Sequence, residues 1–82
     1  MDQIVRLPNQ LGALIRSARL GRNMTQQQLA SLIGKQQKPI SAIENGNDGT
    51  RLDTLLQVIA VLDLDLQIIP RRKDGKDIAD VF

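Results

Sequence analysis

The stretch from Thr25 to Gly46, TQQQLASLIGKQQKPISAIENG, constrains the fold most, because it predicts two short helices joined by a tight turn. The Thr25 hydroxyl can accept hydrogen bonds from the free backbone N–H groups of the first turn. Gly34 follows the last apolar residue and can adopt the left-handed conformation that ends a helix. Ala30 is expected where the two helices cross, because a larger side chain would push them apart.

An ordinary helical hairpin is the alternative interpretation, since short helix pairs joined at a glycine are common. The polar run from Gln36 to Lys38 argues against it, because packing alone does not require two amides and an ammonium at the exposed start of the second helix. Those side chains suit contact with base edges in DNA. Gln37 can bind adenine through two hydrogen bonds, and Lys38 can donate to guanine O6 and N7. Gln36 and Ser41 are adjacent base-reading candidates.

With these features the chain resembles the XRE/Cro–CI superfamily of phage-repressor-like DNA-binding domains over roughly residues 8–62. The resemblance implies a helix-turn-helix domain. Lys35 departs from the pattern, but its stem can cover the turn. Ala42 stands where the family often has a long base-reading side chain, and it offers only a methyl group for that contact. The residues that carry the resemblance are Thr25-Gln26, Leu29-Ala30, Ile33-Gly34, Ile40-Ser41 and Ile43-Glu44-Asn45-Gly46.

Helices are expected at about residues 8–21, 25–34, 36–45 and 51–62, with Pro8 suited to the first helical position. Beyond residue 62 the period changes, because Leu64, Leu66 and Ile68 alternate with polar residues and predict a strand over about 64–69. A lone strand leaves an unpaired edge. We therefore predict that it pairs with the same strand of a second copy across a two-fold axis. A short fifth helix is the alternative.

The predicted fold is thus mostly α: a lambda-repressor-like four-helix domain over residues 1–70, with a C-terminal strand that forms an intermolecular two-stranded sheet in the dimer. Residues 71–82 are predicted to be a flexible tail, which ends in Phe82, the one aromatic residue of the chain. Phe82 is a candidate anchor for a partner's pocket. The alternative is an unstructured terminus.

Four helices, a dimer-forming strand and a short tail resemble HipB-type antitoxins. This resemblance implies a homodimer that binds a palindromic operator in double-stranded DNA, represses its own operon, and binds a HipA-type kinase toxin. A stand-alone XRE regulator without a toxin is one alternative. A protein–protein adaptor that reuses the helix-turn-helix is another, although Gln37 and Lys38 argue against it.

Arg19 and Glu44 match, by the same resemblance, an ion pair that ties the first helix to the recognition helix. Glu44 is one of two acidic residues among the first 46, which makes an arginine partner plausible. Contacts to the DNA phosphates are expected from polar groups near the ends of the two motif helices. Each could instead be a solvated surface group. The candidates are Gln26, Arg22, Lys35, Asn45, Asn47 and Arg51.

Composition narrows the function classes. A chain of 82 residues allows one small domain. It has no Cys and no His, so we expect no metal site, no cofactor and no enzyme activity. Residues 1–46 carry six Lys/Arg and two Asp/Glu, whereas residues 47–70 carry one and four, so the basic part would face phosphates. Without a signal peptide or a long apolar run, a cytoplasmic, nucleoid-associated location is expected.

Overall fold

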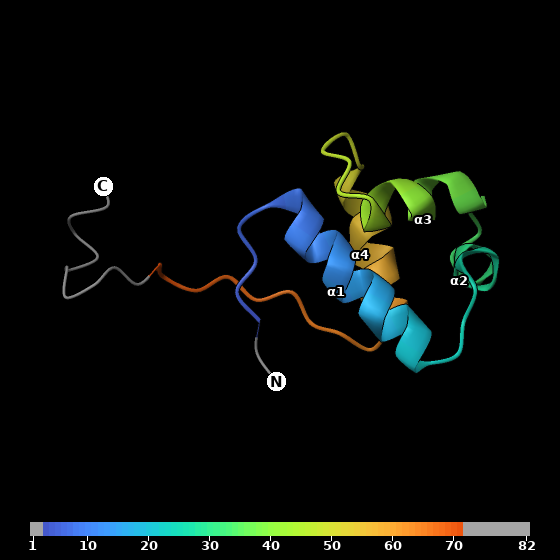
Figure 1. The fold of residues 1–82 in the computed structure, drawn as a ribbon, viewed down its shortest axis with the longest axis horizontal. Helices are drawn as coiled ribbons and strands as arrows, with labels where there is room; N and C mark the ends of the chain where they lie inside the picture. Colours follow the sequence, from blue (N-terminus) through green and yellow to red (C-terminus); the bar gives the residue numbers. More distant parts are fainter. Residues whose placement is uncertain (1–2, 72–82) are drawn as a thin grey trace.

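The computed structural model describes residues 3–71 of the chain, which contain four helices (Figure 1). The predicted four-helix, helix-turn-helix architecture is confirmed. In chain order the helices are α1 (Pro8–Gly21), α2 (Gln26–Leu32), α3 (Gln37–Glu44) and α4 (Leu52–Val61).

Local sequence signals explain where α2 begins and ends. The Thr25 hydroxyl accepts from the Gln28 backbone N–H at 3.0 Å, and the Gln28 side chain accepts from the Thr25 N–H at 2.8 Å, which forms a reciprocal capping box. Gly34 has a φ of 67°, and the N–H of Lys35 donates to the Ala30 carbonyl at 2.9 Å. The helix is therefore shorter than the predicted 25–34, because Thr25 is its cap and Gly34 belongs to its terminating turn.

The core lies where the four helices meet. Helix α1 packs against α3, and α2 packs against both α3 and α4. Four fully buried side chains, one from each helix, fill the centre. Ala30 of α2 also belongs to this core and is 1% exposed. The four buried side chains are Ile15, Leu29, Ile40 and Val58.

The segment after α4 runs away from the helices as an extended chain, orange in Figure 1. Residues 64–71 contain neither the alternative fifth helix nor a strand. A β-ladder needs a second strand, and residues 3–71 contain none. The predicted strand over 64–69 and its pairing in a dimer therefore stay predictions. Leu64, Leu66 and Ile68 are exposed in this chain, Ile68 by 92%. Phe82 lies outside the described residues.

Candidate nucleic-acid interface

The predicted base-reading residues lie together at the start of α3. Gln36 is the N-cap residue, with extended backbone angles and no capping hydrogen bond from its side chain. Gln37 and Lys38 occupy the first two helical positions, and both are exposed. Ser41 lies one turn further along and is half-buried. The first turn of α3 therefore presents two amides and an ammonium group to solvent.

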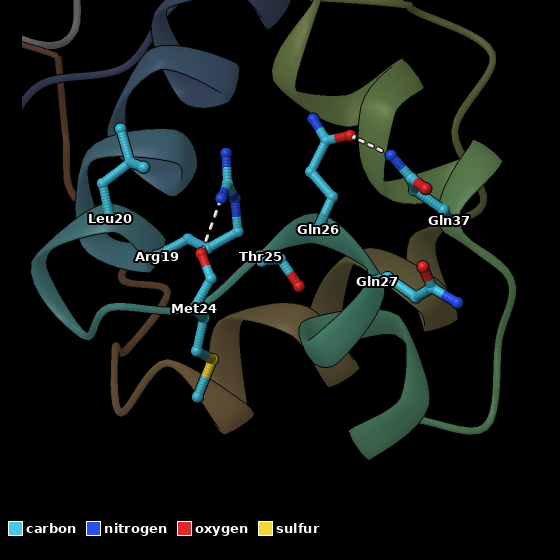
Figure 2. A pocket seen from close by; sticks show the side chains of 7 residues that line it. All are labelled: Arg19, Leu20, Met24, Thr25, Gln26, Gln27 and Gln37. Atoms are coloured by element: carbon cyan, nitrogen blue, oxygen red, sulfur yellow. Dashed lines mark hydrogen bonds between the residues drawn. The ribbon is translucent and has the colours of Figure 1, made fainter.

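A buried ion pair joins α1 to the end of α3. The Arg19 guanidinium donates through Nε to Glu44 Oε2 at 2.6 Å and through Nη2 to Oε1 at 3.0 Å. Its Nη1 donates to the Met24 carbonyl at 2.7 Å (Figure 2). The side chains of Arg19 and Glu44 are only 8% and 2% exposed. This geometry holds the connection between α1 and α2, as well as α3, in a fixed position relative to α1.

The ion pair keeps Glu44 ionised. Burial acts to raise the pKa of Glu44, but hydrogen bonds from Arg19 and Gln26, together with the charge of Arg19, outweigh it and hold that pKa below its ordinary value. The hydrogen bond to Glu44 in turn raises the pKa of Arg19. Both partners therefore stay charged around neutral pH.

Gln26 connects this ion pair to the exposed start of α3. Its Nε2 donates to Glu44 Oε1 at 3.1 Å. Its Oε1 accepts from Gln37 Nε2 at 2.9 Å, the hydrogen bond drawn in Figure 2. The sequence suggests only a phosphate contact for Gln26. Its link to Glu44 has no signal in the sequence, because the two residues lie 18 positions apart on different helices.

The other phosphate candidates are spread around this surface, and several already have partners. Arg51 makes two hydrogen bonds of 3.1 Å to Asp53, and Arg22 lies 3.7 Å from Asp63. The remaining candidates are Asn45 and Asn47, near the end of α3, and Lys35, which is exposed at the turn between α2 and α3. Asn47 Oδ1 accepts from the Gly49 N–H, and the Asn45 side chain donates to the Ser41 hydroxyl.

A hollow of about 460 Å³ lies between the end of α1, the start of α2 and the start of α3 (Figure 2). Its lining includes the hydrogen-bonded side chains of Gln26 and Gln37. The residues that line the hollow are Arg19, Leu20, Met24, Thr25, Gln26, Gln27 and Gln37.

Within residues 3–71, no three acidic residues form a group that could hold a metal ion. Helices in the same range are too short and too polar to span a membrane.

Comparison with known proteins identifies the class that this arrangement defines. The family model described as helix-turn-helix matches residues 15–69, so the chain belongs to the helix-turn-helix family, in its XRE branch. Among solved structures, the chain is similar to one in a HipA–HipB–O2–O3 complex, with 32% identity, a TM-score of 0.77, and coverage of 92% of this chain and 100% of that one. It is similar to the HipB–O4 20mer complex with the same identity, TM-score and coverage. The predicted HipB-type resemblance is thus confirmed. Comparison with curated proteins gives no match.

Proposed function

We propose that this chain is a sequence-specific DNA-binding repressor and the antitoxin of a type II toxin–antitoxin operon. The observation that carries the proposal is the exposed first turn of α3, with Gln37 and Lys38, on a helix-turn-helix similar to that in the HipB–O4 20mer complex. In this proposal a homodimer occupies a palindromic operator and represses its own operon. The same dimer holds a HipA-type Ser/Thr kinase, which the similarity to a HipA–HipB complex supports.

Recognition of bases is assigned to Gln36, Gln37, Lys38 and Ser41. The start of α3 would enter the major groove, where Gln37 can bind an adenine edge and Lys38 a guanine edge. Contacts to phosphates from Gln26, Arg22, Lys35, Asn45, Asn47 and Arg51 would set the register of the domain on the duplex. Arg51 would have to exchange its exposed pair with Asp53 for a phosphate.

Substituting Gln37 and Lys35 separately should distinguish base reading from phosphate contact. Gln37→Ala should lose about 1–3 kcal/mol of discrimination at one position of a selected site. Lys35→Ala should weaken binding to all sequences alike and reduce the dependence of log K on log salt by about one unit. Fluorescence anisotropy with duplexes selected from a random pool measures both quantities. A uniform loss of affinity for Gln37→Ala, with unchanged base preferences, would contradict its assignment.

The dimer is assigned to the segment that contains Leu64, Leu66 and Ile68. These exposed apolar side chains alternate with polar ones, and pairing with a second copy would satisfy the free backbone groups of the segment. Ile68→Lys should therefore raise the dissociation constant of the dimer at least tenfold, since burying one such side chain contributes about 1.5–3 kcal/mol. Gln67→Lys adds the same charge on the other face and serves as the control. Sedimentation equilibrium measures both, and equal behaviour of the two variants would contradict this dimer.

A pull-down from the native host, with the full-length protein as bait and with DNase treatment, tests the antitoxin role. Recovery of a stoichiometric kinase-like protein supports it, and deletion of residues 71–82 then tests whether Phe82 anchors the toxin. Recovery of the homodimer alone contradicts the antitoxin role and favours a stand-alone XRE regulator. A protein that selects no DNA sequence but captures another partner would be an adaptor.

A further inference from the structure

Four side chains form a continuous row of hydrogen bonds from the protein interior to the exposed start of α3. Arg19 donates to Glu44 at 2.6 Å, Gln26 donates to Glu44 at 3.1 Å, and Gln37 donates to Gln26 at 2.9 Å. The Glu44 side chain is almost fully buried, whereas Gln37 is exposed. The buried carboxylate is therefore connected, through one intermediate amide, to the side chain assigned to base reading. Figure 2 shows the outer part of this row, from Gln26 to Gln37.

The chemistry of the carboxylate fixes the direction of this row. An ionised carboxylate can only accept hydrogen bonds, so Gln26 must turn its amino group toward Glu44. Its carbonyl oxygen then faces Gln37, which must donate one N–H to it. A reversed Gln26 would place two acceptors against each other and leave the buried carboxylate short of a donor, which is unfavourable. Gln37 is thus left with its carbonyl oxygen and its second N–H free to face outward.

The free groups of Gln37 have the pattern that an adenine edge requires. In the major groove adenine offers N7 as an acceptor and the N6 amino group as a donor, whereas guanine offers two acceptors, N7 and O6. One outward oxygen and one outward N–H match adenine. A Gln37 amide that is not held by Gln26 could turn its amino group outward and donate to guanine. The row of hydrogen bonds prevents this turn, so it disfavours the binding of guanine by Gln37.

We propose that Glu44 is a positioning residue for base recognition, which acts through Gln26 to fix the donor–acceptor order of Gln37 and thereby favours adenine over guanine. This inference rests on the proposed function, because it requires α3 to read DNA. It assigns to the buried ion pair an effect on sequence preference that is separate from its effect on stability.

Two substitutions break the row at different points. Glu44→Gln introduces an amide that can donate to Gln26, so the order of donors and acceptors can reverse along the row. Gln26→Met removes the intermediate amide and leaves the ion pair between Arg19 and Glu44 in place, so this variant stays informative if the first one fails to fold. The control is Gln27→Met, which makes the same change at the next position of α2, outside the row.

The experiment uses full-length protein and begins with selection of binding sites from random duplexes by the wild type. The position at which Gln37→Ala loses its base preference identifies the base that Gln37 contacts. The ratio of dissociation constants for guanine and adenine at that position is then measured for each variant by anisotropy. We expect the wild type and Gln27→Met to share a ratio of roughly 5 to 150 in favour of adenine. Gln26→Met and folded Glu44→Gln should lower it at least fivefold.

The outcomes separate this inference from the proposed function. A lower ratio in both Gln26→Met and folded Glu44→Gln, with the melting temperature of Gln26→Met close to that of the wild type, supports the positioning role of Glu44. A lower ratio in Gln26→Met with an unchanged ratio in folded Glu44→Gln would show that Gln26 orders Gln37 without Glu44, and overturns that role. An unchanged ratio, even with weaker binding overall, overturns that role and leaves the DNA-binding function intact. A wild-type protein that selects no site overturns both.

Discussion

Replacing Arg19 with alanine should lower the free energy of unfolding by about 3–5 kcal/mol, because it leaves a buried carboxylate without its partner. The Glu44 side chain is only 2% exposed and receives two hydrogen bonds from the guanidinium. The same change removes the donor to the Met24 carbonyl in the connection between α1 and α2. For a domain of this size, the loss corresponds to a decrease in melting temperature of more than about 10 °C.

Urea denaturation and thermal melting of two arginine variants measure this effect. Arg16→Ala is the matched control, since Arg16 lies on the same helix but is exposed, and its loss should change stability by no more than about 0.5 kcal/mol. The double variant Arg19→Met, Glu44→Leu should be more stable than Arg19→Ala, because it buries no unpaired charge. A curve for Arg19→Ala or Glu44→Ala that coincides with the wild type would refute a structural role for the pair.

The Arg19–Glu44 ion pair also predicts how the stability difference between the wild type and Arg19→Ala depends on pH. In the wild type the pKa of Glu44 is lowered below 4.5, so its contribution is complete above that pH and is lost as the pH falls through the lowered pKa. Without Arg19, the effect of burial, which raises the pKa of Glu44, is opposed only by Gln26 and Arg16. We therefore expect the pKa of Glu44 to rise in this variant, so that protonation in acid relieves the destabilisation. The stability difference between wild type and Arg19→Ala should therefore narrow from pH 7 to pH 4. Arg51 also lowers the pKa of Asp53, to about 2. This pair is present in both the wild type and Arg19→Ala, so its titration cancels in the stability difference.

The helices could be predicted from the sequence because their signals are local. Thr25 caps α2 and Gly34 ends it, and both effects depend on residues within one turn. The pairing of the segment at 64–69 is different in kind. Its backbone hydrogen bonds would be made to another copy, so the alternating pattern can indicate a strand while a single chain cannot form the ladder.

The candidate site could be predicted only in part, for the same reason. Exposed Gln37 and Lys38 follow from their place at the start of α3, and the pairing of Arg19 with Glu44 was expected from the family resemblance. The central position of Gln26 could not be predicted, because it depends on the angle at which α2 meets α3. Gln26 makes its side-chain hydrogen bonds to Gln37 and Glu44, which lie 11 and 18 positions further along the chain, so these bonds form only once the chain has folded.

Gly12→Ala should destabilise the fold by about 3 kcal/mol, at the upper end of the cost of overpacking. Gly12 lies on α1 where the helix crosses the end of α3. A Cβ atom there would contact the Ile43 carbonyl oxygen and lie 2.7 Å from the Glu44 carbonyl oxygen. These are backbone atoms, so α3 would have to move away from α1. That movement would also pull Glu44 away from Arg19 and weaken the ion pair that joins the same two helices.

Gly21→Ala is the control for this substitution. Gly21 is the last residue of α1, and a Cβ atom added there would meet no atom within 4 Å. Because alanine favours helix more than glycine does, this variant should be as stable as the wild type or up to about 1 kcal/mol more stable. Chemical denaturation of both variants compares the same chemical change at two positions of one helix. Equal stability of Gly12→Ala and Gly21→Ala would show that α1 and α3 do not approach as closely as Gly12 allows.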